Sequence, residues 1–141
     1  MEAYAGTDVW VNGTFYNTAF SVKEQNAIVA QNVINEKHPD YKTPGGNNTT
    51  DKVFLLSIKE AVNSDYGFCS NSQNKCVSRQ IQTTGYGTAR GVRGNGSNEK
   101  YVNNVGWWLR SPGYRSDFAV QFHPGGSILN GGIWGIIGVK E

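Results

Sequence analysis

The stretch that decides the fold is Gly106-Trp107-Trp108-Leu109-Arg110-Ser111-Pro112-Gly113. Successive side chains of an extended strand point to opposite faces, so the two adjacent tryptophans place one large ring on each face. Pro112-Gly113 then ends the strand, because proline removes a backbone donor and glycine permits a positive φ. We therefore predict that Trp107 or Trp108 anchors the core and that the loops after Gly113 meet a partner.

The composition indicates one polar, turn-rich domain. The chain has 141 residues, and its 13 basic and 11 acidic residues leave a net charge of +2. A nucleic-acid binder would cluster basic residues on one face. Arg79, Arg90 and Arg93 do share a polar stretch, but no RNP-like aromatic run accompanies them. No apolar run is long enough to span a bilayer. With 18 glycines and 17% charged residues, the sequence favours a binding module.

The two cysteines, Cys69 and Cys76, enclose a short polar loop. Zinc is a poor explanation for them, since His38 and His123 do not have ligand spacing. Two alternatives stay open. Either a disulfide closes the loop, worth about 2.5 kcal/mol in the chain-entropy model, or both thiols are free. A disulfide would indicate an oxidising compartment.

The first part of the chain carries helix signals. Residues 7–20 predict short helical turns, with a break at Asn12-Gly13. Ser21-Val22-Lys23-Glu24 is a capping box, in which Ser21 and Glu24 each satisfy an amide of the helix start. Apolar residues behind it follow helical spacing, so an amphipathic helix is expected to run on until just before His38-Pro39.

The rest of the chain predicts a second helix and then strands. Residues 43–51 have loop composition, and Val53-Phe54-Leu55-Leu56 predicts a strand buried on both faces. Ser57-Ile58-Lys59-Glu60 is a second capping box, and residues 63–104 are polar and irregular. Strands are expected at residues 107–110, 118–122, 127–129 and 132–139. Helices followed by an antiparallel meander predict an α+β fold.

Three stretches, residues 10–21, 51–57 and 107–113, resemble an uncharacterised bacterial domain family. Its pattern reads W-L-N-x-x-F-Y-N-x-A-F-S, then D-K-V-F-L-L-S, then W-W-L-R-S-P-G. It closes on G-V-R-P-A, where this chain has Gly138-Val139-Lys140-Glu141. The family is common in Gram-positive gut bacteria and their phages, often in surface or secreted proteins. The resemblance implies an extracellular, cell-surface or virion location.

That family in turn looks like the C-type-lectin fold, in the broad sense that includes formylglycine-generating enzymes and the variable proteins of diversity-generating retroelements. The resemblance implies one domain over residues 1–141, with two or three short helices followed by a small twisted antiparallel sheet. The chain begins almost at the Trp10 helix, so the family's early strands are expected to be missing. A sheet edge would then need cover from the C-terminal strand or from another chain.

Candidate ligand-binding residues lie after the Pro-Gly stop, where Tyr and Arg are of the types enriched at interfaces. They are Tyr114, Arg115, Ser116, Asp117, Phe118, His123, Asn130, Ile133 and Ile136. The expected structural core residues are Trp107, Trp108, Arg110 and Trp134. Two plainer interpretations stay open: an ordinary turn in which Arg115 and Asp117 pair in solvent, and a solvated turn residue at His123.

No enzyme or cofactor motif accompanies these residues. The sequence lacks a nucleophile elbow, a phosphate loop, a metal motif and the cysteine arrangement of formylglycine-generating enzymes. The calcium-lectin motifs are absent as well. We expect a non-enzymatic module, without metal or cofactor, that binds a protein or glycan on a cell surface. It would be the variable protein of a diversity-generating retroelement, or alternatively a structural or assembly domain that forms homo-oligomers. A carbohydrate-active enzyme is the third hypothesis.

Overall fold

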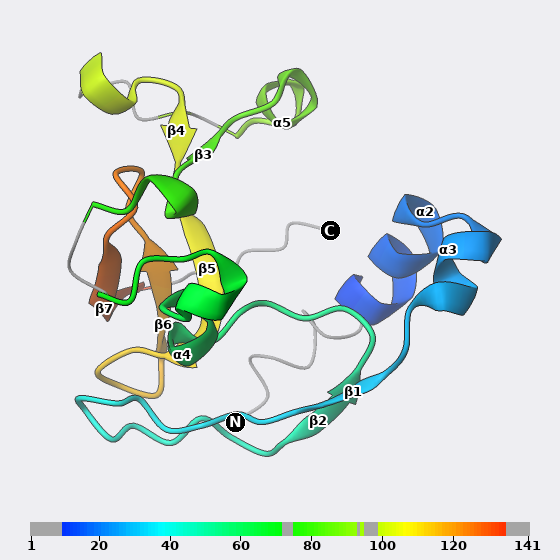
Figure 1. The fold of residues 1–141 in the computed structure, drawn as a ribbon, viewed down its shortest axis with the longest axis horizontal. Coiled ribbons are helices and arrows are strands. Elements are labelled where there is room, and N and C mark those ends of the chain that lie inside the picture. The colour runs from blue at the N-terminus through cyan, green and yellow to red at the C-terminus, as the bar shows by residue number, and fades with distance from the viewer. Residues whose placement is uncertain (1–9, 72–74, 93, 95–98, 135–141) are drawn as a thin grey trace. The chain divides into compact units, whose positions relative to one another are not determined.

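A computed structural model describes residues 10–71, 75–92, 94 and 99–134. The chain forms two compact units. The first comprises Met1–Glu36 with Gly46–Leu55, and the second comprises Lys37–Gly45 with Leu56–Glu141. Few short helices and small antiparallel sheets make up the described part (Figure 1), so the predicted α+β class is confirmed.

The described part of the first unit begins with a π-helix, η1, over Trp10–Phe15, which continues directly into α2, Tyr16–Ala19. The predicted break at Asn12-Gly13 is therefore wrong. The Asn12 side chain explains the difference: its oxygen accepts from the amides of Lys52 and Val53, both at 3.0 Å. Its Nδ2 donates to the Val53 carbonyl oxygen at 3.1 Å. These tertiary bonds hold the turn in place despite the poor helix propensity of the residues around it.

A capping box opens α3, Val22–Ala27, as the sequence predicted: Ser21 accepts from the Glu24 amide, and Glu24 accepts from the Ser21 amide. The long helix predicted up to His38 is wrong, because the chain becomes extended at Ile28. Strand β1, Gln31–Val33, follows and pairs antiparallel with β2, Thr49–Asp51. The β-branched residues from Ile28 onward favour this strand over a helix.

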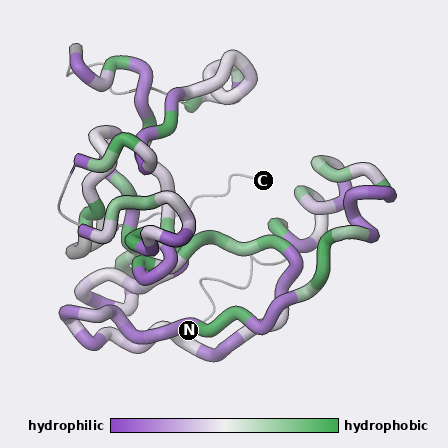
Figure 2. The backbone as a smooth tube through the Cα atoms, viewed as in Figure 1, coloured by the Kyte–Doolittle hydropathy of each residue, from purple (hydrophilic) through white to green (hydrophobic). Residues whose placement is uncertain are grey.

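The apolar run Val53-Phe54-Leu55-Leu56 is not a strand, and it is not buried on both faces. Phe54 is 37% exposed and Leu55 is 40% exposed. Figure 2 shows this run as a hydrophobic segment of the chain between β2 and the next helix, α4, Ile58–Ala61. A short continuous apolar run is ambiguous by pattern alone, since it has no period that would assign it to a strand.

The second unit is built on a three-stranded meander. Strands β5, Trp107–Pro112, β6, Phe118–Phe122, and β7, Ile128–Trp134, pair antiparallel in that order. The two strands predicted over 127–129 and 132–139 are thus one strand in the described part, and residues 135–139 lie outside it. The core consists of α4 and these strands, through Ile58, Ala61, Leu109, Val120, Phe122 and Ile128.

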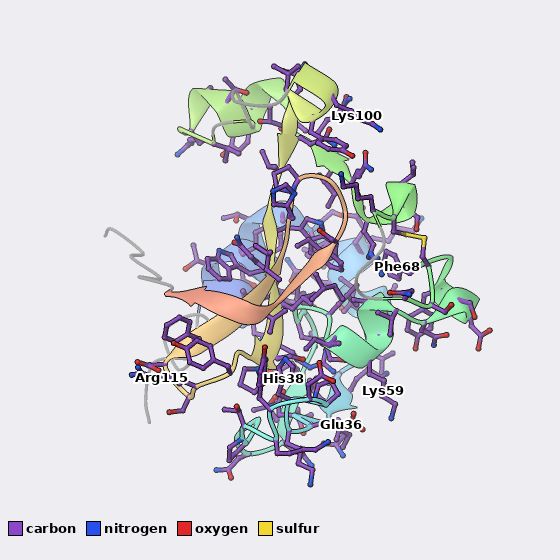
Figure 3. The ribbon with its side chains drawn as sticks, turned by 90° about the vertical axis from the view of Figure 1, so that its left-hand side faces the viewer. Glu36, His38, Lys59, Phe68, Lys100 and Arg115 are labelled. Carbon is purple, nitrogen blue, oxygen red and sulfur yellow. A yellow bond between two sulfur atoms is a disulfide. The ribbon has the colours of Figure 1, made fainter. Side chains whose placement is uncertain are left out.

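Smaller elements fill the stretch predicted to be irregular. They are η2, Ser64–Tyr66, η3, Val77–Arg79, β3, Ile81–Gln82, α5, Gly85–Ala89, η4, Glu99–Tyr101, and β4, Asn104–Val105. Strand β3 pairs antiparallel with β4. Cys69 and Cys76 form a disulfide in this stretch, drawn as the yellow bond in Figure 3.

Trp107 lies at the margin of the core. It shares the core face of β5 with Leu109, which is 1% exposed, whereas Trp107 and Trp108 are both half-buried. The Trp107 ring lies 4.1 Å from that of Phe122, and its Nε1 donates to the Arg79 carbonyl oxygen at 3.1 Å. The side chain of Trp134 lies outside the described residues.

Arg79, in the second unit, is completely buried. Its Nε donates to the carbonyl oxygen of Gly126 at 2.8 Å, and its Nη2 donates to that of Asn71 at 2.8 Å. Its Nη1 donates to the carbonyl oxygens of Cys69, at 3.1 Å, and Ala61, at 3.4 Å. Burial lowers the pKa of the Arg79 guanidinium below its usual range. One side chain thus joins the end of α4, the disulfide loop and the β6–β7 turn.

The position of Gly126 is fixed by this same region. Its φ is +84°, and a Cβ there would lie 2.1 Å from the Cys76 carbonyl oxygen. Only glycine fits, both because of the left-handed backbone and because of the close approach of the disulfide segment.

Arg110 joins β5 to α4. Helix α4, Ile58–Ala61, begins with the second predicted capping box, in which Glu60 accepts from the Ser57 amide at 2.7 Å. Arg110 forms an ion pair with the same Glu60 carboxylate. Ser111 Oγ also accepts from the Ile58 amide at 2.9 Å. Partial burial acts to raise the pKa of Glu60, but the bonds from Arg110 and Ser57 outweigh it and hold the pKa below 4.5, its ordinary value.

We predict that Arg79→Met lowers the free energy of unfolding by at least about 3 kcal/mol, because several buried carbonyl groups lose a charged donor at once. Urea denaturation of the oxidised protein measures it. Arg90→Met is the matched control: Arg90 is exposed, with its guanidinium over the Tyr86 ring, and its loss should change stability by less than about 0.5 kcal/mol. Equal stabilities of the two variants would contradict the role of Arg79.

We also predict that Glu60→Gln lowers the free energy of unfolding by about 1–2 kcal/mol at pH 7, because the partly exposed Arg110–Glu60 pair loses its charge-assisted hydrogen bond. The folded pKa of Glu60 lies below 4.5, so this stabilisation is present above pH 4.5 and disappears as the pH falls through the lowered pKa.

Denaturation of the wild type and of Glu60→Gln at pH 7 and about pH 3 tests this dependence. The difference between their free energies of unfolding should shrink at the lower pH. Glu24→Gln is the matched control, since Glu24 forms the same capping box with Ser21 but is fully exposed. Its effect at pH 7 should be the smaller of the two. A Glu60 difference that is equal at both pH values would show that the carboxylate charge is unimportant.

Candidate recognition surface

The connection from β5 to β6 is a tight turn that presents Tyr114 to Asp117. The Gly113 amide donates to the Phe118 carbonyl oxygen at 2.6 Å, and the Phe118 amide donates to that of Arg115 at 3.1 Å. Pro112 pairs with Ala119 at the base of the turn. The backbone bonds close this turn, and the side chains from Tyr114 to Asp117 are exposed at the end of the sheet.

The side chains of this turn are stacked and paired. Arg115 donates through Nε to Asp117 Oδ1 at 2.9 Å and through Nη2 to Oδ2 at 2.7 Å. The Arg115 guanidinium lies 5.5 Å from the Phe118 ring centroid, and the Tyr114 ring lies 4.6 Å from that of Phe118. The hydrogen bonds from Arg115 to Asp117, together with the charge of this carboxylate, raise the pKa of Arg115.

The sequence left two interpretations of this turn open, a ligand-binding surface and an ordinary turn with a solvated ion pair, and the structure has features of both. Arg115 and Asp117 pair with each other, and they do so in solvent, with 58% and 44% of their side chains exposed. Yet the pair rests on an aromatic ring, and Tyr114 beside it is 45% exposed. Ser116 is exposed in the same turn. The turn therefore offers a neutralised ion pair next to aromatic rings.

A second loop, which the sequence analysis missed, lies against this turn. Tyr41 is 51% exposed, and its ring centroid lies 6.2 Å from that of Tyr114 in an edge-to-face arrangement. Behind it is His38, fully buried, whose ring lies 4.7 Å from the Tyr41 ring. Figure 3 shows Arg115 and His38 at the same end of the sheet. In the sequence, His38-Pro39 was interpreted only as a helix end, and no motif marked Tyr41 as a surface contact residue.

His38 holds the backbone of this loop. Its Nδ1 accepts from the amides of Asp40, at 3.0 Å, and Tyr41, at 3.2 Å. Its own amide donates to the Thr43 carbonyl oxygen at 2.8 Å, and its carbonyl oxygen accepts from the Lys42 amide at 3.0 Å. Lys42 has a φ of +61°, a left-handed conformation that is uncommon for a residue other than glycine.

The other predicted ligand-binding residues do not all join this surface. His123 lies beyond the opposite end of β6, in a turn where its Nδ1 accepts from the Gly125 amide at 3.1 Å. The backbone of Ile133 pairs with Ala119, at the end of β6 near Tyr114. Asn130 lies nearer the start of β7, away from that end. The side chains of Asn130 and Ile133, and all of Ile136, lie outside the described residues.

Among the described residues, no group of three or more His, Cys, Asp or Glu side chains could hold a metal ion. Within that part, no helix is long and apolar enough to cross a membrane.

A family model described as a domain of unknown function, DUF6273, matches residues 3–134. The chain belongs to the DUF6273 family. No curated protein matches this DUF6273 domain, and no solved structure matches it either. Family membership therefore assigns no ligand to this surface.

Proposed function

We propose that this DUF6273 domain is a non-enzymatic module that binds a ligand or receptor through the turn between β5 and β6. One observation carries the proposal: the Tyr114 ring and the Arg115 guanidinium both lie against the Phe118 ring, at the end of a hydrogen-bonded sheet. Tyrosine and arginine are enriched where binding energy is concentrated. Rings that are already packed lose little conformational freedom on binding, which favours affinity.

The support beneath the turn favours the same function. Strand β5 is tied to α4 through Arg110 and Ser111, and β6 carries the buried core residues Val120 and Phe122. Side chains at the tip can change without disturbing that core, as in other binding loops on rigid scaffolds. We further propose a C-type-lectin-like fold and an extracellular, cell-surface or virion location. Short helices followed by an antiparallel meander, and the disulfide, support these two proposals.

A variable protein of a diversity-generating retroelement is the specific form of this proposal. Its support is the separation between the turn, with exposed side chains, and the buried strand β6 beside it. A reverse transcriptase gene and a near-identical template repeat in the neighbouring DNA are the expected finding. Their absence from the source genome would contradict the retroelement proposal, but it would not contradict the proposal of a binding module.

The alternative is a structural or assembly domain, and exposed apolar side chains in the first unit favour it. Val22 and Val29 are 73% and 69% exposed, and Phe54 and Leu55 of the same unit are 37% and 40% exposed. Apolar surface of this kind is found at sites of association. Sedimentation velocity separates the two functions: an assembly domain forms a defined oligomer that Val29→Lys disrupts, whereas a binding module stays monomeric.

The combined variant Tyr114→Ala, Arg115→Ala and Asp117→Ala tests the leading function. Arrays of purified glycans and of purified folded proteins identify the partner, and titration then measures affinity. We expect at least a tenfold weaker affinity with an unchanged melting temperature, because these side chains are about half exposed. Phe118 is kept, since its half-buried ring supports the turn.

The matched control is Tyr86→Ala with Arg90→Ala. These residues are also exposed, and the Arg90 guanidinium lies 5.2 Å from the Tyr86 ring centroid. This control should bind within twofold of the wild type. If the combined variant unfolds, the turn is structural; if it binds as before, recognition occurs elsewhere. Either result would overturn the proposal.

A further inference from the structure

We propose that the loop of residues 38–43 forms the second half of this recognition surface, that Tyr41 contacts the partner directly, and that the partner is a folded protein. This inference rests on the proposed function, and it adds a contact residue and a class of partner to it. It starts from the edge-to-face contact between Tyr41 and Tyr114, whose ring centroids are 6.2 Å apart.

The position of Tyr41 makes it part of the same surface. About half of Tyr41 and of Tyr114 is exposed, although each packs against a further ring, His38 for the one and Phe118 for the other. A ligand seated on Tyr114 therefore has the Tyr41 ring beside it. Tyrosines held in this way supply contact area at a low entropic cost, as they do in antibody loops.

The loop is built to hold Tyr41 in this place. His38 is fully buried, and its Nδ1 accepts from the amides of both Asp40 and Tyr41. Within the described part of the chain, Lys42 alone among residues other than glycine has a positive φ. Such a conformation costs energy and persists when its surroundings enforce it, most often at functional sites. The left-handed Lys42 and the buried His38 ring together fix where Tyr41 lies.

The exposure of these side chains decides the class of partner. Tyr41, Tyr114, Arg115 and Asp117 are between 44% and 58% exposed, so they project from the two loops and do not line an enclosure. Small ligands bind in concave sites that cover most of their surface. A protein can instead cover a projecting surface from outside, with tyrosine and arginine as its anchors. The neutralised Arg115–Asp117 pair also places no unbalanced charge at the centre of this contact.

The experiment screens the wild type on the array of purified folded proteins and, in parallel, on the array of purified glycans. Affinity for each hit is then titrated for Tyr41→Ala, Tyr114→Ala and the double variant. We expect hits on the protein array, weakened at least tenfold by either single change. The double variant should lose less than the product of the two single losses, because the rings contact each other. Tyr66→Ala and Tyr86→Ala, which alter exposed tyrosines outside this surface, should stay within twofold.

The outcomes separate this inference from the function beneath it. Weakening by Tyr114→Ala but not by Tyr41→Ala overturns the inference and leaves the binding function intact. Hits on glycans alone overturn the protein partner. No hit on either array, or hits indifferent to both tyrosines, overturns the inference together with the proposed function. Melting temperatures are measured for every variant, and if Tyr41→Ala is unfolded, Tyr41→Gln replaces it, since glutamine keeps a side chain over His38.

Discussion

The second unit depends on the satisfaction of one buried cation. An arginine without exposure to water is unfavourable unless its donors find acceptors, and Arg79 finds them on the backbone of three separate segments. Its guanidinium also lies 5.5 Å from the ring centroid of Phe122, while its carbonyl oxygen accepts from Trp107. The packing of the core strands, the disulfide loop and the β6–β7 turn therefore depends on the same side chain.

Local sequence rules predicted the features that depend on neighbouring residues. Both capping boxes form, and strand β6 has the bounds expected from its pattern. The strand carrying Trp107 was also expected, and it ends at Pro112. The capping partners lie three residues apart, and each of these strands carries its signal in its own residues, so composition and spacing contain enough information.

The errors arose where a distant partner decides the outcome. Residues 28–34 have helical spacing, but pairing with Thr49–Asp51 draws Gln31–Val33 into a strand. Arg79 was interpreted as a member of a weak basic group, because nothing near it in sequence reveals the carbonyl groups that it meets. Tyr41 and Tyr114 are 73 positions apart in the printed sequence (114 minus 41), and no pattern relates them. The DUF6273 match covers most of the chain, yet it leaves these long-range contacts to the structure.

The two ends of β6 differ in how much sequence change they tolerate. At one end, Gly126 has no room for a Cβ, and its carbonyl oxygen accepts from Arg79. At the other end, the turn from Tyr114 to Asp117 closes through backbone bonds, which do not depend on the identity of its side chains. Mutations arising along this hairpin would thus be purged at the first end and retained at the second. Under the proposed function, a lineage could change the ligand of the domain many times and keep its fold.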